Sequence, residues 1–418
     1  MLVRFALLTF SIVAVLSTAV AGEWTEFRGP GGDGHAPAAP LPLTWSESEG
    51  VAWKTAIPGR GWSSPVVLEG QIWLTTATDQ GRSLRAIAVD AATGSIVHQV
   101  EVFREAEALT VNEKNSHASP SPVIEPGRVY VHFGTLGTAC LSTETGGILW
   151  TNRELLLDHK EGPGSSPVIW NDLILLNCDG MDVQYVAALD KSTGQLVWKT
   201  ERSGELDPNP DFRKAYSTPL VVHAAGRDQW ISVGADQTIA YDPRTGEELW
   251  VVRYKGFSNV PRPVFAHDLV YLVTSYNRPE LWAVALDGRG DVTSSHVRWT
   301  TNQQVPSIPT PIVVGDWMFF VSNRGVATCL DARTGEMQWR ERLGGNFAAS
   351  PIVAGDRVYA SNESGETFVF RASPQFELLT VNRLNEGLMA TPAVTEGAIL
   401  LRTLSQLYRI EDRASASR

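Results

Sequence analysis

Polar and aromatic side chains stand in the loops of this chain at places that recur along it. One set lies just before a repeated proline, and a second set lies in the next polar loop. The candidate binding residues are Arg60, Trp62, Asn115, His117, Asp179, Arg213, Lys214, Tyr216, Asn259, Arg262, Asn323 and Arg324. Cations, carboxylates, amides and aromatic rings together suit a polar or anionic small ligand, a sugar or a peptide. The alternative is that they are ordinary hydrated surface groups.

Residues that could carry covalent or metal chemistry form no recognisable set. The three cysteines are far apart; Cys140 and Cys329 take a small-residue position in a repeated turn, which predicts packing. Cys178 ends an apolar segment, and no base for its thiol is identified. The sequence has no His-x-x-x-His pair, phosphate loop or Gly-x-Ser-x-Gly elbow. We therefore predict no catalytic residue and no metal ligand.

The elements that must position these loops belong to an internal repeat. A small hydroxyl residue, or Arg262 once, precedes a proline and aliphatic residues at Pro65, Pro122, Pro167, Pro219, Pro263, Pro311, Pro351 and Pro392. The prolines recur at intervals of about 40 to 57 residues, close to the period of propeller blades. Each is followed by two apolar runs around a Gly, Asp or Asn turn, which predicts a hairpin.

A second repeated signature is a small residue, an apolar residue, then Asp-x-x-Thr-Gly-x-x-x-Trp. Its clearest copies supply Asp190, Thr193, Gly194, Trp198, Asp242, Thr245, Gly246, Trp250, Asp331, Thr334, Gly335 and Trp339. The Asp can bond its own backbone and the Gly can take positive φ, so we predict a tight turn between two strands. The Trp then lies on the outer strand, where its ring can pack against the neighbouring blade.

Each unit therefore has four antiparallel strands, and the proline count gives eight units. The last unit lacks its Trp strand, whereas residues 51–55 form such a strand with no hairpin of their own. We predict an all-β, eight-bladed β-propeller over residues 51–411, closed by the N-terminal strand completing the last blade. Residues 22–50 are predicted as an extended N-terminal segment, and residues 412–418 as a C-terminal tail.

Residues 1–21 have the three parts of a secretory signal. Arg4 precedes an apolar run over 5–16, and Ala19-Val20-Ala21 offers a cleavage site. An uncleaved anchor is the alternative, although the run is short for a membrane span. No Cys lies near the cleavage site, which argues against lipid attachment. We predict a periplasmic or secreted protein without a transmembrane segment after cleavage.

The composition excludes some partners. The net charge is −11, and the charges are spread along the chain, which argues against a nucleic-acid binder. Three cysteines cannot build a disulfide scaffold. We expect a monomer.

The Asp-x-x-Thr-Gly-x-x-x-Trp turns resemble the pyrroloquinoline-quinone-like propeller repeat family over roughly residues 51–411. That family includes quinone-dependent dehydrogenases and the non-enzymatic outer-membrane assembly factor BamB. Residues 24–30 (WTEFRGP), 43–45 and 58–62 also resemble secreted BamB-like propellers of planctomycete-type bacteria. The quinone enzymes are similar to one another in an adjacent Cys-Cys pair, a Glu/Asn/Asp calcium site and an Asp base. The present chain departs from that pattern because it has no adjacent cysteines.

The resemblance implies a non-catalytic binding or scaffold module of the cell envelope that contacts an envelope or outer-membrane protein and needs no cofactor. One alternative is a quinone-dependent (PQQ) oxidoreductase. Another is a propeller that binds a polar small molecule or carbohydrate at its channel mouth.

Overall fold

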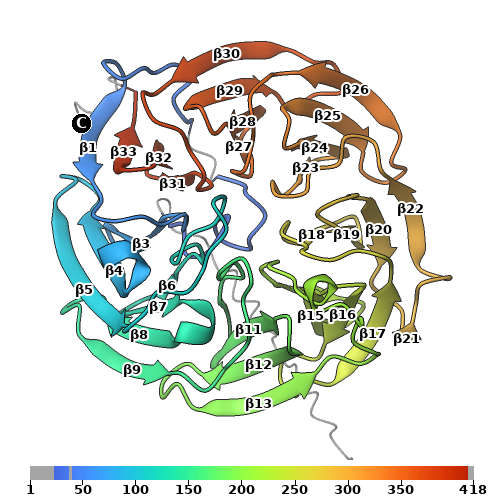
Figure 1. Ribbon diagram of the computed structural model, residues 1–418. Helices are drawn as coiled ribbons and strands as arrows, with labels where there is room; N and C mark the ends of the chain where they lie inside the picture. The colour runs from blue at the N-terminus through green and yellow to red at the C-terminus, as the bar shows by residue number, and fades with distance from the viewer. Residues whose placement is uncertain (1–22, 37–39, 413–418) are drawn as a thin grey trace, which may run out of the picture.

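The computed structural model describes residues 23–36 and 40–412, and these form a ring of eight β-sheets around a central channel (Figure 1). The predicted all-β, eight-bladed propeller is confirmed. Only three short 3₁₀ turns interrupt the described strands: η1 (Asp79–Gly81), η2 (Gly134–Leu136) and η3 (Pro210–Phe212). Among the described residues, no helix has the length and apolar character that a membrane crossing requires. The predicted signal peptide and residues 413–418 of the predicted tail lie outside this range.

Blades 1 to 4 follow one another along the chain, with strands ordered from the channel outward. Blade 1 has β2 (Val66–Leu68), β3 (Gln71–Thr78), β4 (Ser83–Asp90) and β5 (Ile96–Arg104). Blade 2 has β6 (Val123–Glu125), β7 (Arg128–His132), β8 (Thr138–Ser142) and β9 (Ile148–Asn152). Blade 3 has β10 (Val168–Trp170), β11 (Leu173–Asp179), β12 (Gln184–Asp190) and β13 (Leu196–Glu201). Blade 4 has β14 (Leu220–Ala224), β15 (Arg227–Val233), β16 (Gln237–Tyr241), β17 (Glu248–Arg253) and the added β21 (Gly290–Asp291).

Blades 5 to 8 complete the ring. Blade 5 has β18 (Val264–Ala266), β19 (Leu269–Val273), β20 (Leu281–Ala285) and β22 (Val297–Thr301). Blade 6 has β23 (Ile312–Val314), β24 (Trp317–Val321), β25 (Val326–Asp331) and β26 (Met337–Arg342). Blade 7 has β27 (Ile352–Ala354), β28 (Arg357–Ser361), β29 (Glu366–Arg371) and β30 (Leu378–Arg383). Blade 8 has β31 (Ala393–Thr395), β32 (Ala398–Arg402) and β33 (Gln406–Ile410), with β1 (Val51–Ala56) as its outer strand.

The ring is closed by the two ends of the propeller sequence. β1 pairs antiparallel with β33, from Val51 opposite Ile410 to Ala56 opposite Gln406. The last blade therefore takes its outer strand from the start of the chain, as the sequence predicted. This pairing leaves no blade incomplete and removes a gap at which the ring could open.

The Asp-Thr-Gly turns join each blade to the one before it. The Asp190 carboxylate accepts hydrogen bonds from the Ser192 and Thr193 amides at 2.9 and 2.8 Å. This turn brings Gly194, at a φ of +74°, so close to the Trp150 ring of blade 2 that an added Cβ would lie 2.4 Å from a ring carbon. The Trp150 indole N–H also donates to the Lys191 carbonyl at 2.9 Å. Trp198 lies against Gly246 and Trp299 against Gly335 in the same way, which explains why the Trp and the Gly recur together.

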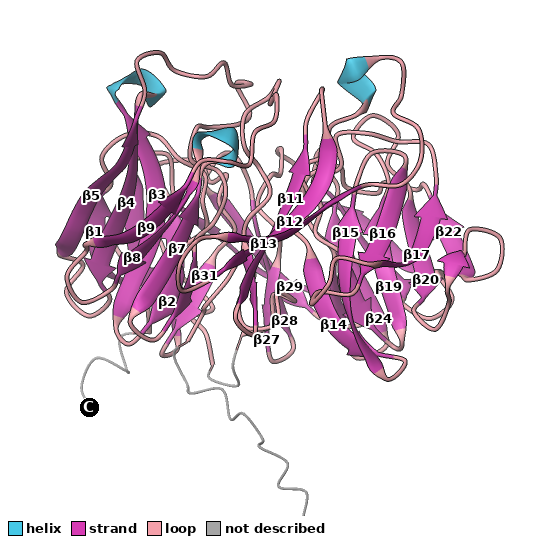
Figure 2. Ribbon diagram, turned by 90° about the horizontal axis from the view of Figure 1, so that it is seen from below, coloured by secondary structure: helices cyan, strands magenta, loops and turns pink. Residues whose placement is uncertain are grey.

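The loops that lead into the innermost strands and those that join second to third strands lie on one face of the ring, which we call the upper face. All three 3₁₀ turns lie there (Figure 2). The tight turns between first and second strands lie on the opposite, lower face because neighbouring strands are antiparallel. The upper face therefore carries the long loops 105–122 and 202–219.

The N-terminal segment lies inside the ring, beside the innermost strands (Figure 1). Trp24 pairs with Val67 of blade 1, and His35 pairs with Val353 of blade 7. The fully buried Arg28 donates to the carbonyls of Pro311 and Pro351, each at 3.1 Å. Residues 24–36 therefore cross the channel from one side to the other. We call them the N-terminal plug.

Candidate binding site at the channel mouth

The upper half of the channel is a cavity of about 260 Å³ that is open to the upper face. Phe27 of the N-terminal plug is part of its lining. Trp62, Tyr216, Tyr276 and Met389 contribute larger side chains to the same lining. The cavity is therefore a cup that combines an apolar surface with polar groups, which is the usual character of a ligand pocket.

A ring of hydroxyl groups forms the cavity wall. In six of the eight blades the residue before the repeated proline donates its backbone N–H to the hydroxyl oxygen in the next blade, as Ser64 does to Ser121 at 2.9 Å and Ser350 to Thr391 at 3.0 Å. Six lining hydroxyls accept a bond in this way: Ser121, Ser166, Thr218, Thr310, Ser350 and Thr391. Because the oxygen accepts, each hydroxyl retains its own O–H as a donor.

Arg262 interrupts the hydroxyl ring and holds the plug instead. Its side chain is buried and donates to the Pro219 carbonyl at 3.0 Å, to the Phe27 carbonyl at 2.6 Å and to the Glu26 carboxylate at 3.0 Å. An Arg at the position of a small hydroxyl residue is thus explained by a contact with the N-terminal segment. Its guanidinium therefore makes its hydrogen bonds at the base of the cavity.

Three of the twelve sequence-predicted binding residues line the cavity: Trp62, Asn115 and Tyr216. The Arg60 guanidinium lies 4.9 Å from the Trp62 ring, in an adjoining depression that Lys114 and Glu363 also line. Arg324 is exposed, and Asn323 accepts the Ser307 amide at 2.7 Å. His117 contacts the Leu109 carbonyl at 2.8 Å and so fixes its own loop.

The remaining predicted residues support the mouth rather than line the cavity. Arg213 donates to the Asp207 carbonyl at 2.6 Å, and Lys214 to the Asp211 carbonyl at 2.6 Å. Asn259 is buried and donates to the Gly234 carbonyl at 2.6 Å. These bonds hold the loop that ends in Tyr216. Asp179 serves the same loop through an ion pair.

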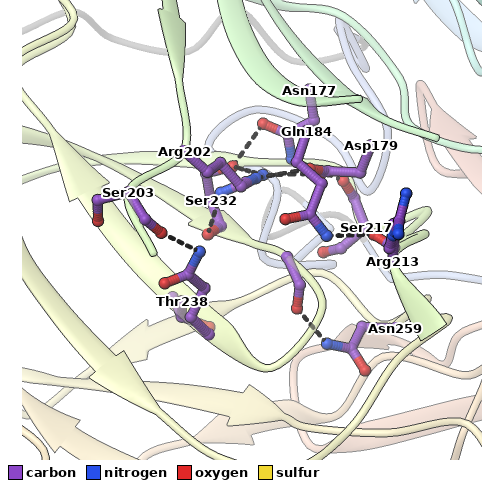
Figure 3. Close-up of polar contacts among 12 residues, drawn as sticks. Asn177, Asp179, Gln184, Arg202, Ser203, Arg213, Ser217, Ser232, Thr238 and Asn259 are labelled. Carbon is purple, nitrogen blue, oxygen red and sulfur yellow. Dashed lines mark hydrogen bonds and ion pairs between the residues drawn. The ribbon is translucent and has the colours of Figure 1, made fainter. Parts of the chain in front are cut away.

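A buried polar network anchors the loop over residues 202–217 to blades 3 and 4 (Figure 3). Arg202 binds both oxygens of Asp179, at 2.6 and 2.7 Å, and donates to the Ser232 hydroxyl at 2.6 Å. Asn177 accepts from that hydroxyl at 2.7 Å and donates to the Ser217 carbonyl at 2.9 Å. Burial raises the pKa of Asp179, and the adjacent Arg202 charge opposes that rise.

Several residues that line the cavity are not among the twelve predicted binding residues. Phe27 and Met389 come from segments whose neighbours in space are distant in sequence, so no local pattern marks them. Lys114 and Glu161 stand in long loops among other charged residues. One sequence signal could have pointed to the N-terminal segment as part of the lining: Arg262 stands at a position where the other repeats have a small hydroxyl residue.

Two histidines, the buried His132 and the half-buried His159, lie beside the network. The Thr135 amide donates to His159 Nε2 at 3.1 Å, and His132 Nδ1 lies 2.9 Å from the Thr138 hydroxyl. Burial lowers the pKa of His132 to about 3, with His159 adding to the effect. Burial also lowers the pKa of His159 to about 4, against the attraction of Asp182. Both rings are therefore neutral in the folded protein above these values.

We predict that the free energy of unfolding falls as the pH is lowered from 7 to 4.5. The unfolded histidines take up protons near pH 6.5, whereas the folded ones do so only near pH 3 to 4. The stabilisation is thus complete above pH 6.5 and is lost below it, by roughly 2.5 kcal/mol per histidine at pH 4.5. Urea unfolding across this range should show His159→Gln with a flatter profile. The exposed His223→Gln should keep the parental slope, and equal slopes for both variants would contradict the assignment.

A family model described as outer membrane protein assembly factor BamB matches residues 43–176 and 182–417 of the chain. The chain belongs to this family. The BamB of Moranella endobia is 21% identical over 285 residues, which cover 68% of the present chain and 66% of that protein. The quinoprotein ethanol dehydrogenase of Pseudomonas aeruginosa is 27% identical over 151 residues, covering 34% of the chain and 23% of the enzyme. The chain thus spans at most about two thirds of the length of these relatives.

The fold of the BamB family is shared with quinone enzymes. The solved structure of quinohemoprotein alcohol dehydrogenase from Comamonas testosteroni superposes with a TM-score of 0.67 at 10% identity, over 93% of the present chain and 80% of that enzyme. At this identity the likeness concerns the fold alone. The chemistry of the cavity must therefore be assessed from the residues themselves.

The cavity of this BamB-family chain does not fit the quinone and calcium site of those enzymes. Its three cysteines are buried in core clusters, and none lines the cavity. Burial raises the pKa of each thiol to about 12. Within residues 23–36 and 40–412, no three His, Cys, Asp or Glu side chains gather as metal ligands would.

Proposed function

We propose that this chain is a non-catalytic docking module of the cell envelope, and that its upper face binds an envelope protein partner. Membership of the BamB family supports this function, because members are described as outer membrane assembly factors. The observation that supports the upper face as the docking surface is an aromatic cluster on its loops, formed by Phe212, Phe257 and Tyr276.

The aromatic cluster is exposed and held in place. Phe212 and Phe257 stack with ring centroids 4.4 Å apart, and the Tyr276 amide donates to the Phe257 carbonyl at 3.1 Å. Phe212 is 38% exposed and Tyr276 is 40% exposed. The polar network below the cluster fixes the loop that carries Phe212. Exposed aromatic residues on a fixed base are typical of the energetic centre of a protein interface.

Site-specific photo-crosslinking in envelope extracts tests this proposal. A photoreactive residue at Phe212 or Tyr276 should capture one defined outer-membrane assembly protein. The same group at Asp172, in a lower-face turn with a side chain 90% exposed, should not capture it. The double variant Phe212→Ser/Tyr276→Ser should lose the partner and keep its thermal midpoint. Equal capture from both faces, or none from the upper face, would exclude an upper docking surface.

A second candidate function is binding of a polar small molecule or carbohydrate in the cup, which the six converging hydroxyls favour. Crystals soaked with oligosaccharides should show density between Trp62 and Tyr216, and Trp62→Ala should weaken binding. Arg262 is unsuitable for this test because its loss would also release the plug. Dye-coupled alcohol oxidation with added quinone and calcium should stay at background, and turnover there would favour the dehydrogenase alternative instead.

A further inference from the structure

Blade 4 differs from the other blades because its outer edge already holds a fifth strand. β21 pairs in parallel with β17, with Trp250 opposite Gly290 and Val251 opposite Asp291. Beyond this pairing, the Val292 amide donates to the Val251 carbonyl at 2.9 Å, and the Arg253 amide donates to the Thr293 hydroxyl at 2.9 Å. The loop between β20 and β22 therefore covers the free backbone groups of β17. The outer strand of this repeat is thus able to accept a short parallel strand.

Within the part of the chain that the structure describes, the corresponding outer strands of blades 1 to 3 carry no such cover. β5, β9 and β13 each stand last in a four-stranded sheet. Each begins with two adjacent aliphatic residues that are 36–51% exposed: Ile96 and Val97, Ile148 and Leu149, Leu196 and Val197. In β17 the same two positions hold Glu248 and Leu249, and neither is fully exposed. Three neighbouring blades therefore combine open backbone edges with exposed aliphatic side chains.

Exposed apolar edges are usually guarded in soluble proteins by charges, by proline or by a covering segment. Other outer edges of this ring follow that rule. In β30 the Arg383 end is bridged in parallel by Ser46, and in β1 Lys54 forms an ion pair with Glu47 at 2.5 Å. The first two positions of β5, β9 and β13 have neither a charge nor a proline. β5 and β13 carry charges farther along, in the Glu101–Arg104 and Lys199–Glu201 ion pairs. The first two positions of all three strands nevertheless present an apolar edge that is suited to a partner strand.

We propose that the outer edges of blades 1 to 3 bind an extended polypeptide segment rich in aliphatic residues, which adds as a parallel fifth strand as β21 does on β17. Backbone hydrogen bonds to the open edge would supply affinity that depends little on sequence, and the aliphatic pairs would favour apolar segments. This site is separate from the upper-face docking surface, and neither depends on the other.

Binding of a labelled peptide to the full chain tests the inference. The probe is a short fluorescein-labelled peptide of alternating valine and threonine with terminal lysines. A proline-interrupted peptide of the same composition is the control, because it cannot continue a ladder. Fluorescence anisotropy should report binding of the first peptide only. Hydrogen exchange should slow at backbone amides of β5, β9 and β13, while protection confined to the cavity loops would overturn the proposal.

Edge variants complete the test. Val97→Lys, Leu149→Lys and Val197→Lys together should weaken peptide binding by about tenfold or more, because they place charges where aliphatic side chains should pack in all three edges. Met337→Lys on the outer strand of blade 6 is the matched control and should bind like the parent. Unchanged binding by this triple variant would overturn the proposal, as would peptide-dependent self-association of the chain through these edges. The Phe212→Ser/Tyr276→Ser variant should bind the peptide normally, which keeps this test independent of the proposed function.

Discussion

Replacement of Asp179 by Asn is expected to lower the free energy of unfolding by about 3–5 kcal/mol, because it leaves a buried guanidinium without its counter-charge. The Arg202 and Asp179 side chains are 0% and 1% exposed and share two hydrogen bonds. The same change should loosen the loop that Arg202 and Asn177 anchor. Urea unfolding measures the first effect. Hydrogen exchange at residues 213–217 measures the second.

Two further variants separate the buried pair from a general effect of charge. Glu377→Gln removes a carboxylate that pairs with Arg371 at 2.6 Å on the surface, and it should change stability by less than about 1 kcal/mol. Adding Arg202→Met to Asp179→Asn should recover part of the lost stability, since no unpaired charge then remains buried. If Asp179→Asn were no more damaging than Glu377→Gln, the network could not be what fixes the mouth of the cavity.

The architecture was predictable because each blade repeats the same local solution. The hydroxyl before seven of the eight prolines, the Asp190-type turn and the Trp150-type ring all act between neighbouring blades, so they leave a regular signature. The incomplete last unit could also be recognised in the sequence. The N-terminal end of the propeller has an outer strand without a hairpin, the C-terminal end has a unit without its outer strand, and the two pair as β1 and β33. The repeated sequence was therefore sufficient to predict both the propeller fold and the way in which the ring closes.

The cavity was only partly predictable because the N-terminal plug that forms its base is not part of the repeat. Trp62, Asn115 and Tyr216 were placed at the mouth from loop position alone, and they line the cavity. Phe27 and Arg28 contact blades some 300 positions away in the chain, and no periodicity reports such contacts. The sequence predicted Asp179 as a binding residue of the channel mouth and did not single out Arg202, whereas the fold buries the two side chains together.

Replacement of Arg28 by Met is expected to detach the N-terminal plug while leaving the ring folded. The Arg28 guanidinium donates to carbonyls of blades 6 and 7 and to the Asp33 carbonyl at 2.9 Å. Burial lowers the pKa of Arg28 to about 9, so the group is still charged at neutral pH and makes strong hydrogen bonds. Their loss should cost about 2–4 kcal/mol. Hydrogen exchange of residues 24–36 should accelerate sharply.

The ring strands should keep their protection in Arg28→Met, because closure by β1 and β33 does not involve the plug. The exposed Arg298→Met serves as the control and should leave exchange in residues 24–36 unchanged. Arg262→Met should reproduce the effect of Arg28→Met, since it releases Glu26 and the Phe27 carbonyl. With Phe27 displaced, the cup would lose part of its lining, so a ligand that needs the closed cup should bind more weakly to both variants. Uniform acceleration across all eight blades would instead show that the plug and the ring unfold as one unit.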